Sequence, residues 1–321
     1  MEKTSLIGLD WGTSALRAYL FARDGRVIER ARSDAGIQAL RDAGFRAAFE
    51  AVCAPWLAAR PDLPVIASGM IGSRQGWHEA PYVATPAGFA QLASGLLRID
   101  RDAGRPFAIV PGVSTAPSSG PADVMRGEET QVFGALSGDA ASGRRRARVV
   151  LPGTHSKWVE VLDGQIVAFR TYLTGELYAV LSEHSIVGRL FPSPDDPAHG
   201  RWATHAFAQG LERASADPAG LASLLFSVRA EGLLGRYPAD ALPSYLSGLL
   251  IGAEIAHARS DPMHAGPMSA PLTIVAAPEL AQRYAFAFRR LGVDAAPAGG
   301  EPAAAGLFAI ATAAGLPLAA A

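Results

Sequence analysis

The alternation of apolar and polar residues near the start of the chain predicts three strands in succession. Residues Ser5–Ser33 (SLIGLDWGTSALRAYLFARDGRVIERARS) give a strand, a Gly-Thr-Ser turn, a second strand, an Asp-Gly turn and a third strand. An Asp-Gly pair between alternating apolar residues, here Asp24-Gly25, is one of the strongest hairpin signals. We therefore expect a three-stranded meander in this segment.

The same succession returns about 140 residues later in the chain. Residues Arg148–Leu173 (RVVLPGTHSKWVEVLDGQIVAFRTYL) give a strand, a Gly-Thr-His-Ser turn, a strand, an Asp-Gly turn and a strand. One Asp-Gly hairpin arises easily by chance. Two of them, each preceded by a strand and a Gly-Thr turn, indicate an internal duplication.

Helical and strand patterns follow each meander. The first is followed by an amphipathic segment at Ala43–Ala59 and a buried strand at Pro64–Met70. The second is followed by helical patterns at Leu177–Phe191, Pro218–Gly235 and Leu242–Arg259, and by a strand, a turn and a helix within Pro271–Gly292. These patterns predict an α/β fold with mixed sheets, in which two similar domains flank a cleft.

The composition places the domain boundary between Pro111 and Gly138, where a loop gives way to a helix. We divide the chain into an N-terminal domain of residues 1–124 and a C-terminal domain of residues 125–302. The uncharged segment after Glu301 raises the question of a membrane span, but it is mostly Ala and Gly. We expect residues 303–321 to form a helix that packs back on the N-terminal domain.

Charge and cysteine content exclude several classes of protein. The net charge of −1 leaves no basic surface typical of nucleic-acid or membrane binding. The single cysteine, Cys53, allows no disulfide framework, and Asp10 interrupts the first apolar run before a signal-peptide core could form. We therefore expect a cytoplasmic protein that acts on small molecules, with a composition compatible with a homodimer.

Both Gly-Thr turns have the composition of phosphate-binding loops. Glycine lets the backbone approach a phosphate closely, and hydroxyl and amide groups donate hydrogen bonds to its oxygens. The candidate residues are Gly12, Thr13 and Ser14 in the first turn, and Gly153, Thr154, His155 and Ser156 in the second. Two such turns facing each other would clamp a polyphosphate.

A carboxylate and a cation lie beside the first turn. Asp10 directly precedes it and could hold Mg²⁺ through the water shell of the ion, as is usual beside substrate phosphates. Arg17 could add positive charge near the phosphates. Neither the Walker A motif nor a G-x-G-x-x-G fingerprint occurs, so the P-loop and Rossmann folds lack their signatures.

Five segments resemble the 2-dehydro-3-deoxygalactonokinases, within the superfamily of sugar kinases, Hsp70 and actin. They are Ala67–Gly88, Asp123–Leu136, Leu151–Val161, Leu173–Leu190 and Ser244–Ile255, in order along nearly the whole chain. The resemblance implies two duplicated ribonuclease-H-like domains with an interdomain cleft. It also implies ATP- and Mg²⁺-dependent phosphorylation of 2-dehydro-3-deoxy-D-galactonate at its 6-hydroxyl, a step in galactonate catabolism. Adenosine would then bind in the C-terminal domain at a turn near Ala277, where the glycine usual in such folds is missing.

The segment after the strand at Pro64–Met70 is the candidate sugar-acid site, because ligands bind at strand ends in α/β sheets. Arg74 could bind the carboxylate, Trp77 could form an apolar wall, and Glu79 or Tyr82 could bond hydroxyls. Glu176 is a further candidate.

Phosphoryl transfer also needs a group that orients or deprotonates the attacking hydroxyl. The segment PADVMRGEETQ offers Asp123, Glu128 and Glu129. Favourable charge at a helix N-terminus explains one of the two glutamates, which open a helix. Asp123 and Glu128 remain as nearly equal candidates for the catalytic base, with Arg126 as a phosphate contact.

Three other functions compete with this reading. A phosphohydrolase of the exopolyphosphatase type has the same fold and also carries a Gly-Glu-Glu near its domain junction, but it would favour a basic tunnel that the composition does not suggest. A kinase of another 2-keto sugar acid would share every motif. A non-catalytic sensor on the actin-like scaffold would often add a helix-turn-helix or a zinc cluster, for which this chain offers no segment and only one cysteine.

Overall fold

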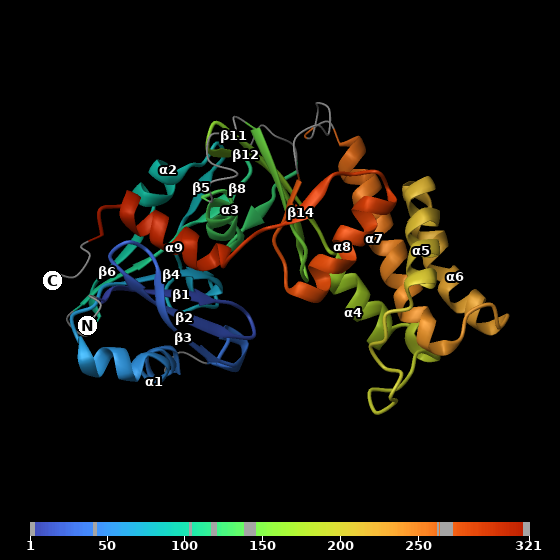
Figure 1. Cartoon of the computed structure of the whole chain (residues 1–321), viewed down its shortest axis with the longest axis horizontal. Coiled ribbons are helices and arrows are strands. Elements are labelled where there is room, and N and C mark those ends of the chain that lie inside the picture. Colours follow the sequence, from blue (N-terminus) through green and yellow to red (C-terminus); the bar gives the residue numbers. More distant parts are fainter. Residues whose placement is uncertain are drawn as a thin grey trace. The chain divides into compact units, whose positions relative to one another are not determined.

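The chain folds into two compact units, seen here in a computed structural model (Figure 1). The structure describes residues 4–40, 44–102, 105–116, 121–137, 146–261, 263 and 272–316. Unit 1 comprises Met1–Ala147, Val161–Phe169 and Ala298–Ala321, and unit 2 comprises Arg148–Glu160 and Arg170–Pro297. Unit 1 therefore continues past the boundary drawn at residue 124 from the sequence.

A six-stranded sheet forms the centre of unit 1, in the order β3-β2-β1-β4-β7-β6. These strands are β1 (Thr4–Trp11), β2 (Leu16–Ala22), β3 (Val27–Ser33), β4 (Val65–Gly69), β6 (Leu97–Asp102) and β7 (Arg105–Ile109). The first three pair antiparallel, which confirms the predicted meander, and β4 pairs parallel with β1 and with β7. The carboxyl ends of β1 and β4 therefore lie side by side.

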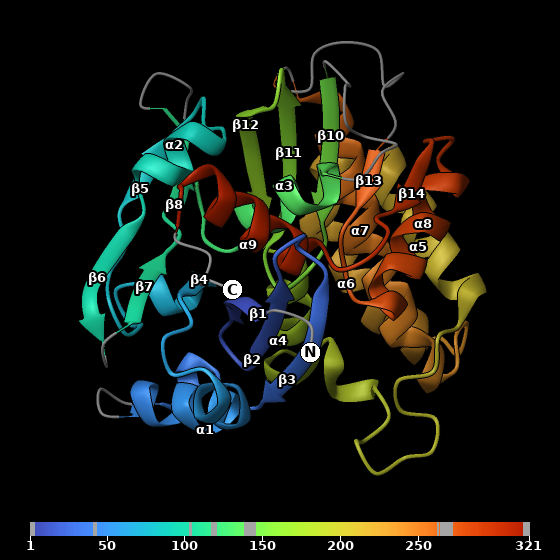
Figure 2. The same cartoon turned by 60° about the vertical axis from the view of Figure 1, so that its left-hand side comes forward.

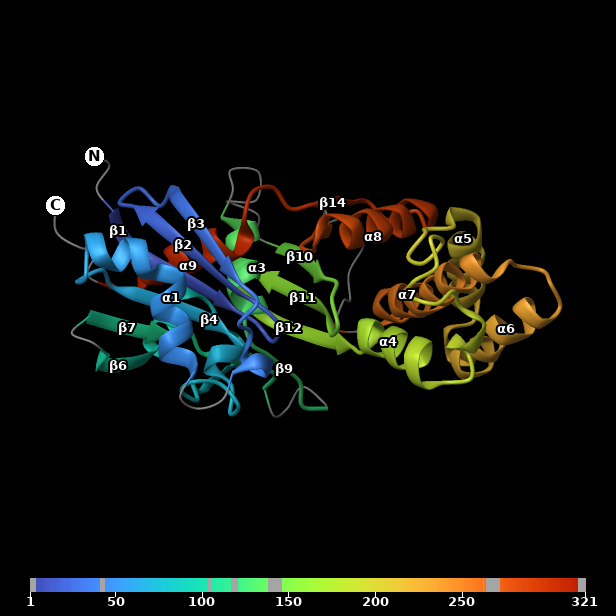
Figure 3. The same cartoon turned by 90° about the horizontal axis from the view of Figure 1, so that it is seen from below.

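Helices cover the faces of this sheet (Figure 3). The amphipathic α1 (Gly44–Ala59) buries Phe45, Phe49, Cys53 and Trp56 in the core of the sheet. The C-terminal α9 (Pro302–Ala313) packs against β1, β4 and α3 (Glu128–Leu136). A Cβ atom added at Gly306 would lie 1.9 Å from the backbone oxygen of Thr130, so small residues in α9 allow this close packing.

Smaller elements complete unit 1. They are α2 (Phe89–Ser94), a three-stranded sheet of β5 (Tyr82–Ala84), β8 (Gly112–Ser114) and β9 (Val124–Met125), and 3₁₀ turns at Ile37–Ala39 and Met70–Gly72. Within the described residues, no helix of either unit is long and apolar enough to cross a membrane.

The second sheet repeats the strand order of the first, β12-β11-β10-β13-β14 (Figure 2). Its strands are β10 (Arg146–Leu151), β11 (Ser156–Leu162), β12 (Gln165–Tyr172), β13 (Leu272–Ile274) and β14 (Ala295–Pro297). As in the first sheet, the fourth strand pairs parallel with the first and the fifth. The repeated order confirms the duplication and the ribonuclease-H-like fold of both halves that were predicted from the sequence.

Helices make up most of unit 2. They are α4 (Thr174–His184), α5 (Thr204–Ala216), α6 (Leu221–Leu233), α7 (Leu242–Ser260) and α8 (Pro278–Arg290), with 3₁₀ turns at Gly188–Leu190, Pro218–Gly220 and Ala239–Ala241. The predicted helix at Leu177–Phe191 begins earlier and ends at His184. The long α7 is buried along most of its length and packs closely against α5.

Candidate active site

The first Gly-Thr turn joins β1 to β2 and is held in place by its own backbone. The amide of Gly12 donates to the carbonyl of Ala15 at 2.9 Å, and the carbonyls of Gly12 and Thr13 accept from Ile37 and Gln38. Thr13 and Ser14 are exposed, so their hydroxyls face solvent. Backbone hydrogen bonds hold the turn, and its tip is accessible to solvent, as a phosphate-binding loop requires.

Asp10 lies at the end of β1, opposite Arg17 of β2. The Arg17 Nη1 atom lies 3.2 Å from Asp10 Oδ2, so the arginine predicted to contact phosphate pairs with the predicted metal ligand. Burial raises the pKa of Asp10, Arg17 opposes that rise, and the charge of Glu128 adds to it. Glu128 is therefore close enough for its charge to influence the ionisation of Asp10.

The N-terminus of α3 brings two further carboxylates to this strand end. Glu129 is buried and accepts from the amide of Gly127 at 2.7 Å, and Ser68 and Thr130 donate to its other oxygen at 3.3 and 3.1 Å. Burial, followed by the charge of Glu128, raises the pKa of Glu129 to about 7.

The register of the sheet explains why these groups converge. Ser68 is the β4 partner of Asp10 in the parallel register, so its bond to Glu129 ties α3 to the strand end. The sequence pointed to Asp10 and Glu128 but not to Ser68. Within the described residues, no three histidine, cysteine or acidic side chains form a metal cage.

The residues predicted for the sugar acid lie on the segment that follows β4. Arg74 is 89% exposed and lies 3.7 Å from Glu79, which is also exposed. Trp77 stacks on Phe45 of α1, with ring centroids 6.4 Å apart, so much of its role is in packing. Tyr82, on β5, is 45% exposed.

Arg126 lies beneath Tyr82. Its guanidinium carbon is 4.2 Å from the Tyr82 ring centre, and its Nη2 donates to the carbonyl of Ala80 at 2.8 Å. The side chain is buried, and its Nε and Nη1 atoms have no hydrogen-bond partner within the described part of the chain. Buried guanidinium donors without partners are costly, so an anion at this place would stabilise the segment.

Asp123 and Glu128 differ in their surroundings. Asp123 lies at the start of β9, and its Oδ1 accepts from the amide of Val124 at 2.8 Å. Glu128 opens α3, is half-buried, and accepts from the amide of Arg126 at 3.0 Å. Of the two, Glu128 is the one whose charge raises the pKa of Asp10.

The second Gly-Thr turn joins β10 to β11 and packs against the N-terminus of α4. A Cβ atom at Gly175 would lie 2.3 Å from the carbonyl oxygen of Gly153, so only glycine permits this approach. The amide of Glu176 donates to the carbonyl of Thr154 at 2.9 Å. The Glu176 carboxylate lies 2.5 Å from His155 Nε2. The N-terminus of a helix favours anions, and here it lies beside the turn.

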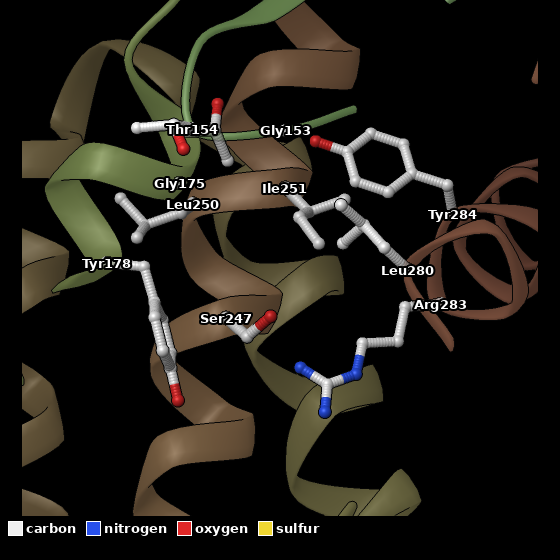
Figure 4. A pocket seen from close by; sticks show the side chains of 11 residues that line it. Gly153, Thr154, Gly175, Tyr178, Ser247, Leu250, Ile251, Leu280, Arg283 and Tyr284 are labelled. Atoms are coloured by element: carbon white, nitrogen blue, oxygen red, sulfur yellow. The ribbon is translucent and has the colours of Figure 1, made fainter. Parts of the chain in front are cut away.

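A pocket of about 230 Å³ in unit 2 adjoins this turn (Figure 4). Its walls come from the turn itself, α4, α7 and α8. They consist of Gly153, Thr154, Thr174, Gly175, Tyr178, Ser247, Leu250, Ile251, Leu280, Arg283 and Tyr284. Most of the lining is apolar or aromatic, while Ser247 and Arg283 supply polar groups. Within the described residues, Arg283 has no carboxylate in ion-pair range.

Of the nucleotide contacts predicted in the second turn and before α8, His155, Ser156 and Ala277 do not line this pocket. Ser156 is buried, and its hydroxyl donates to Glu254 at 2.7 Å, so the protein itself uses that donor. Ala277 is exposed and precedes α8. The pocket is lined instead by the next turns of α8. Ser247, Arg283 and Glu254 were missed, because helical patterns in the sequence do not show which helices meet.

The pocket, the two glycine turns and the duplicated sheets agree with the comparison with known proteins. A family model described as 2-keto-3-deoxy-galactonokinase matches residues 10–310. The chain belongs to this family. It is 38% identical over 297 residues to the 2-dehydro-3-deoxygalactonokinase of Escherichia coli (strain K12), covering 92% of this chain and 94% of the relative.

Two further relatives support the same family. A protein of Rhizobium meliloti (strain 1021), provisionally named 2-dehydro-3-deoxygalactonokinase, is 41% identical over 251 residues, covering 78% of this chain and 79% of the relative. A crystal structure of a Sinorhizobium meliloti protein with the same provisional name matches with a TM-score of 0.83 and 36% identity, covering 96% of this chain and 98% of that one. The resemblance noted from the sequence is therefore confirmed, and the chain is a kinase of this family.

Proposed function

We propose that this kinase transfers the γ-phosphoryl group of ATP to the 6-hydroxyl of 2-dehydro-3-deoxy-D-galactonate. The observation that carries the proposal is the family match, which extends over nearly the whole chain and includes both glycine turns. No comparison favours the phosphohydrolase reading.

The nucleotide is proposed to bind in unit 2. A pocket of about 230 Å³ is smaller than the roughly 300–1,000 Å³ of whole small-molecule sites, so it suits the base and sugar of a nucleotide. A Cβ atom at Gly153 would meet no atom within 4 Å, so the space beside the turn is open to phosphate. The residues present therefore fit ATP.

Unit 1 is proposed to supply the acidic groups of the reaction. Asp10 would hold Mg²⁺ through water, and the ion would neutralise charge on the phosphates. Glu128 is the preferred base, because of the two carboxylates it is the one whose charge influences Asp10 at the strand end. The Gly12–Ser14 turn, with exposed hydroxyls, would bind phosphate.

The carboxylate of the sugar acid is proposed to bind either Arg74, which follows β4, or Arg126, which follows β9. Arg74 is accessible, and Arg126 has two buried donors without partners in the described residues. Separate Arg74→Gln and Arg126→Gln variants would distinguish them, because loss of the arginine that binds the carboxylate should raise the KM for the sugar acid more than the KM for ATP.

The predictions of a homodimer and of a cytoplasmic location stay predictions.

A coupled ADP-release assay with Mg²⁺-ATP tests the function. It compares 2-dehydro-3-deoxygalactonate, its gluconate epimer and no acceptor. We expect turnover that depends on the galactonate compound. Turnover only with the epimer would show a kinase of another sugar acid, and ADP release without any acceptor would show a phosphohydrolase.

A further inference from the structure

Glu254 is a buried carboxylate in the middle of α7, surrounded on its helix by apolar and small residues. Four neutral groups donate hydrogen bonds to it. The Ser156 hydroxyl and the Trp158 indole each donate to Oε1 at 2.7 Å, and the Tyr284 hydroxyl donates to Oε2 at 2.7 Å. The hydroxyl of Thr174 also donates to Oε2.

These donors come from three different elements around the pocket. Ser156 ends the second Gly-Thr turn at the start of β11, and Thr174 opens α4. Tyr284 belongs to α8, and its hydroxyl points toward Gly153 across the pocket (Figure 4). Glu254 does not line this pocket; it lines an adjoining pocket of about 360 Å³ that shares Thr174 and Leu250 with the first. Its bonds to Thr174 and Tyr284 connect it to the walls of the first pocket.

We propose that Glu254 is a positioning residue that fixes the phosphate turn, the N-terminus of α4 and the Tyr284 wall in the geometry that binds the nucleotide. The inference rests on the proposed function, in which ATP occupies this pocket. It adds a residue that does not line the nucleotide pocket itself. Burial raises the pKa of Glu254, and the four donors oppose that rise because they favour the ionised carboxylate, which only accepts hydrogen bonds.

The chemistry of the donors shows what an amide would change. An indole N–H cannot accept, so the amide oxygen of a Glu254→Gln side chain has to stay toward Trp158 and Ser156. Its NH₂ group then faces Thr174 and Tyr284, whose hydroxyls have to rotate to accept. The variant keeps the size of the side chain and the number of partners, but it reverses the two bonds that reach α4 and α8.

The test is calorimetric titration of ADP, with kcat and both KM values, on the wild type and the Glu254→Gln variant. We expect the Kd for ADP and the KM for ATP to rise about 10-fold. The KM for the sugar acid and kcat should stay within about threefold of wild type.

Glu231→Gln is the matched control. Glu231 is also buried in unit 2, but it pairs with Arg213 Nη1 at 2.6 Å and does not line the pocket. A purely structural role for Glu254 predicts that both variants lose thermal stability while ADP affinity is unchanged, and this result would overturn the proposal.

Ser156→Ala and Trp158→Phe provide the test where Glu254→Gln fails to fold, because both residues donate to Glu254 and neither lines the pocket. Each removes one donor to the carboxylate, and a smaller rise in the Kd for ADP is expected for both. Wild-type ADP affinity in both variants would contradict the proposal. Absence of ADP binding by the wild type would refute the proposed nucleotide site itself, so the two failures are distinguishable.

Discussion

The two Gly-Thr turns share a backbone plan but differ in the groups around them. Asp10 lies two residues before Gly12 in the first turn. At the matching position of the second turn, two residues before Gly153, lies the buried Leu151. In unit 1 the carboxylates lie close together, and the pKa values of Asp10 and Glu129 are raised. In unit 2 burial also raises the pKa of Glu254, but here four side-chain donors surround the carboxylate and oppose the rise.

The difference shows that the two halves of a duplicated fold can have different functions. Carboxylates with raised pKa values that lie near one another are typical of sites where protons or metal ions are handled. A neighbouring carboxylate contributes to the raised pKa values of Asp10 and Glu129, whereas burial raises and the four donors lower the pKa of Glu254, so we assign Glu254 to structure. We infer that the first turn serves the chemistry and the second turn holds the nucleotide.

Replacement of Asp10 by Asn should have the largest effect. Removal of the charge that would hold the metal shell is expected to lower kcat by roughly 10²–10³-fold, the loss typical of an electrostatic contact to the transition state. Steady-state kinetics checks the loss, and circular dichroism checks that the fold is kept. Near-normal turnover would remove Asp10 from the site.

Glu128→Gln and Asp123→Asn should separate the two candidate bases. Loss of a general base costs roughly 10²–10⁴-fold in rate, so kcat should fall by at least about 10²-fold in the Glu128 variant. The Asp123 variant should stay within a few-fold of wild type, because its charge, unlike that of Glu128, is not among the causes that shift the pKa of Asp10. The opposite order of kcat values would make Asp123 the base.

Alanine at three glycines should distinguish ligand contact from packing. A Cβ atom at Gly12 lies 3.7 Å from its nearest neighbour, and one at Gly153 meets nothing within 4 Å. Gly12→Ala and Gly153→Ala should therefore keep the thermal midpoint but raise the KM for ATP. Gly175→Ala should lower the midpoint, because its Cβ would lie 2.3 Å from a backbone oxygen.

That pattern is checked by thermal unfolding and by KM for ATP on the same three preparations. Unchanged KM values in the Gly12 and Gly153 variants would show that phosphate does not approach these turns.

The smallest effect concerns the pH dependence of stability. The pKa of Glu129 is raised from 4.5 to about 7, so the folded chain binds this proton more tightly than the unfolded chain. Stability should therefore fall as the pH rises from about 4.5 to 7, by about 3 kcal/mol at most. Denaturant unfolding between pH 5 and 8 should show this slope in the wild type, and Glu129→Gln should flatten it. An equal slope in both proteins would exclude Glu129 as its source.

The sequence predicted the parts of the fold that depend on local pattern. The meanders, the Asp-Gly turns and the duplication followed from alternation and turn residues within single segments. The helix at Leu177–Phe191 was drawn too long, because apolar residues continue after His184 while the backbone becomes extended at Ser185.

Candidate residues in the turns could be proposed from the sequence, whereas contacts between distant segments could not. Asp10, Gly12 and Gly153 lie in recognisable turns. Ser156 and Glu254 bond across 98 residues of sequence, and no periodicity reports such a contact. Arg17 was assigned to phosphate from its charge, but antiparallel register places it opposite Asp10.

The most direct test of the division between the two turns is ADP affinity without Mg²⁺, measured by calorimetry on Asp10→Asn and Glu254→Gln. We predict that the Kd for ADP of Asp10→Asn is close to that of the wild type and that the Kd of Glu254→Gln is about 10-fold higher than that of the wild type. Weak binding by Asp10→Asn together with wild-type binding by Glu254→Gln would contradict this division.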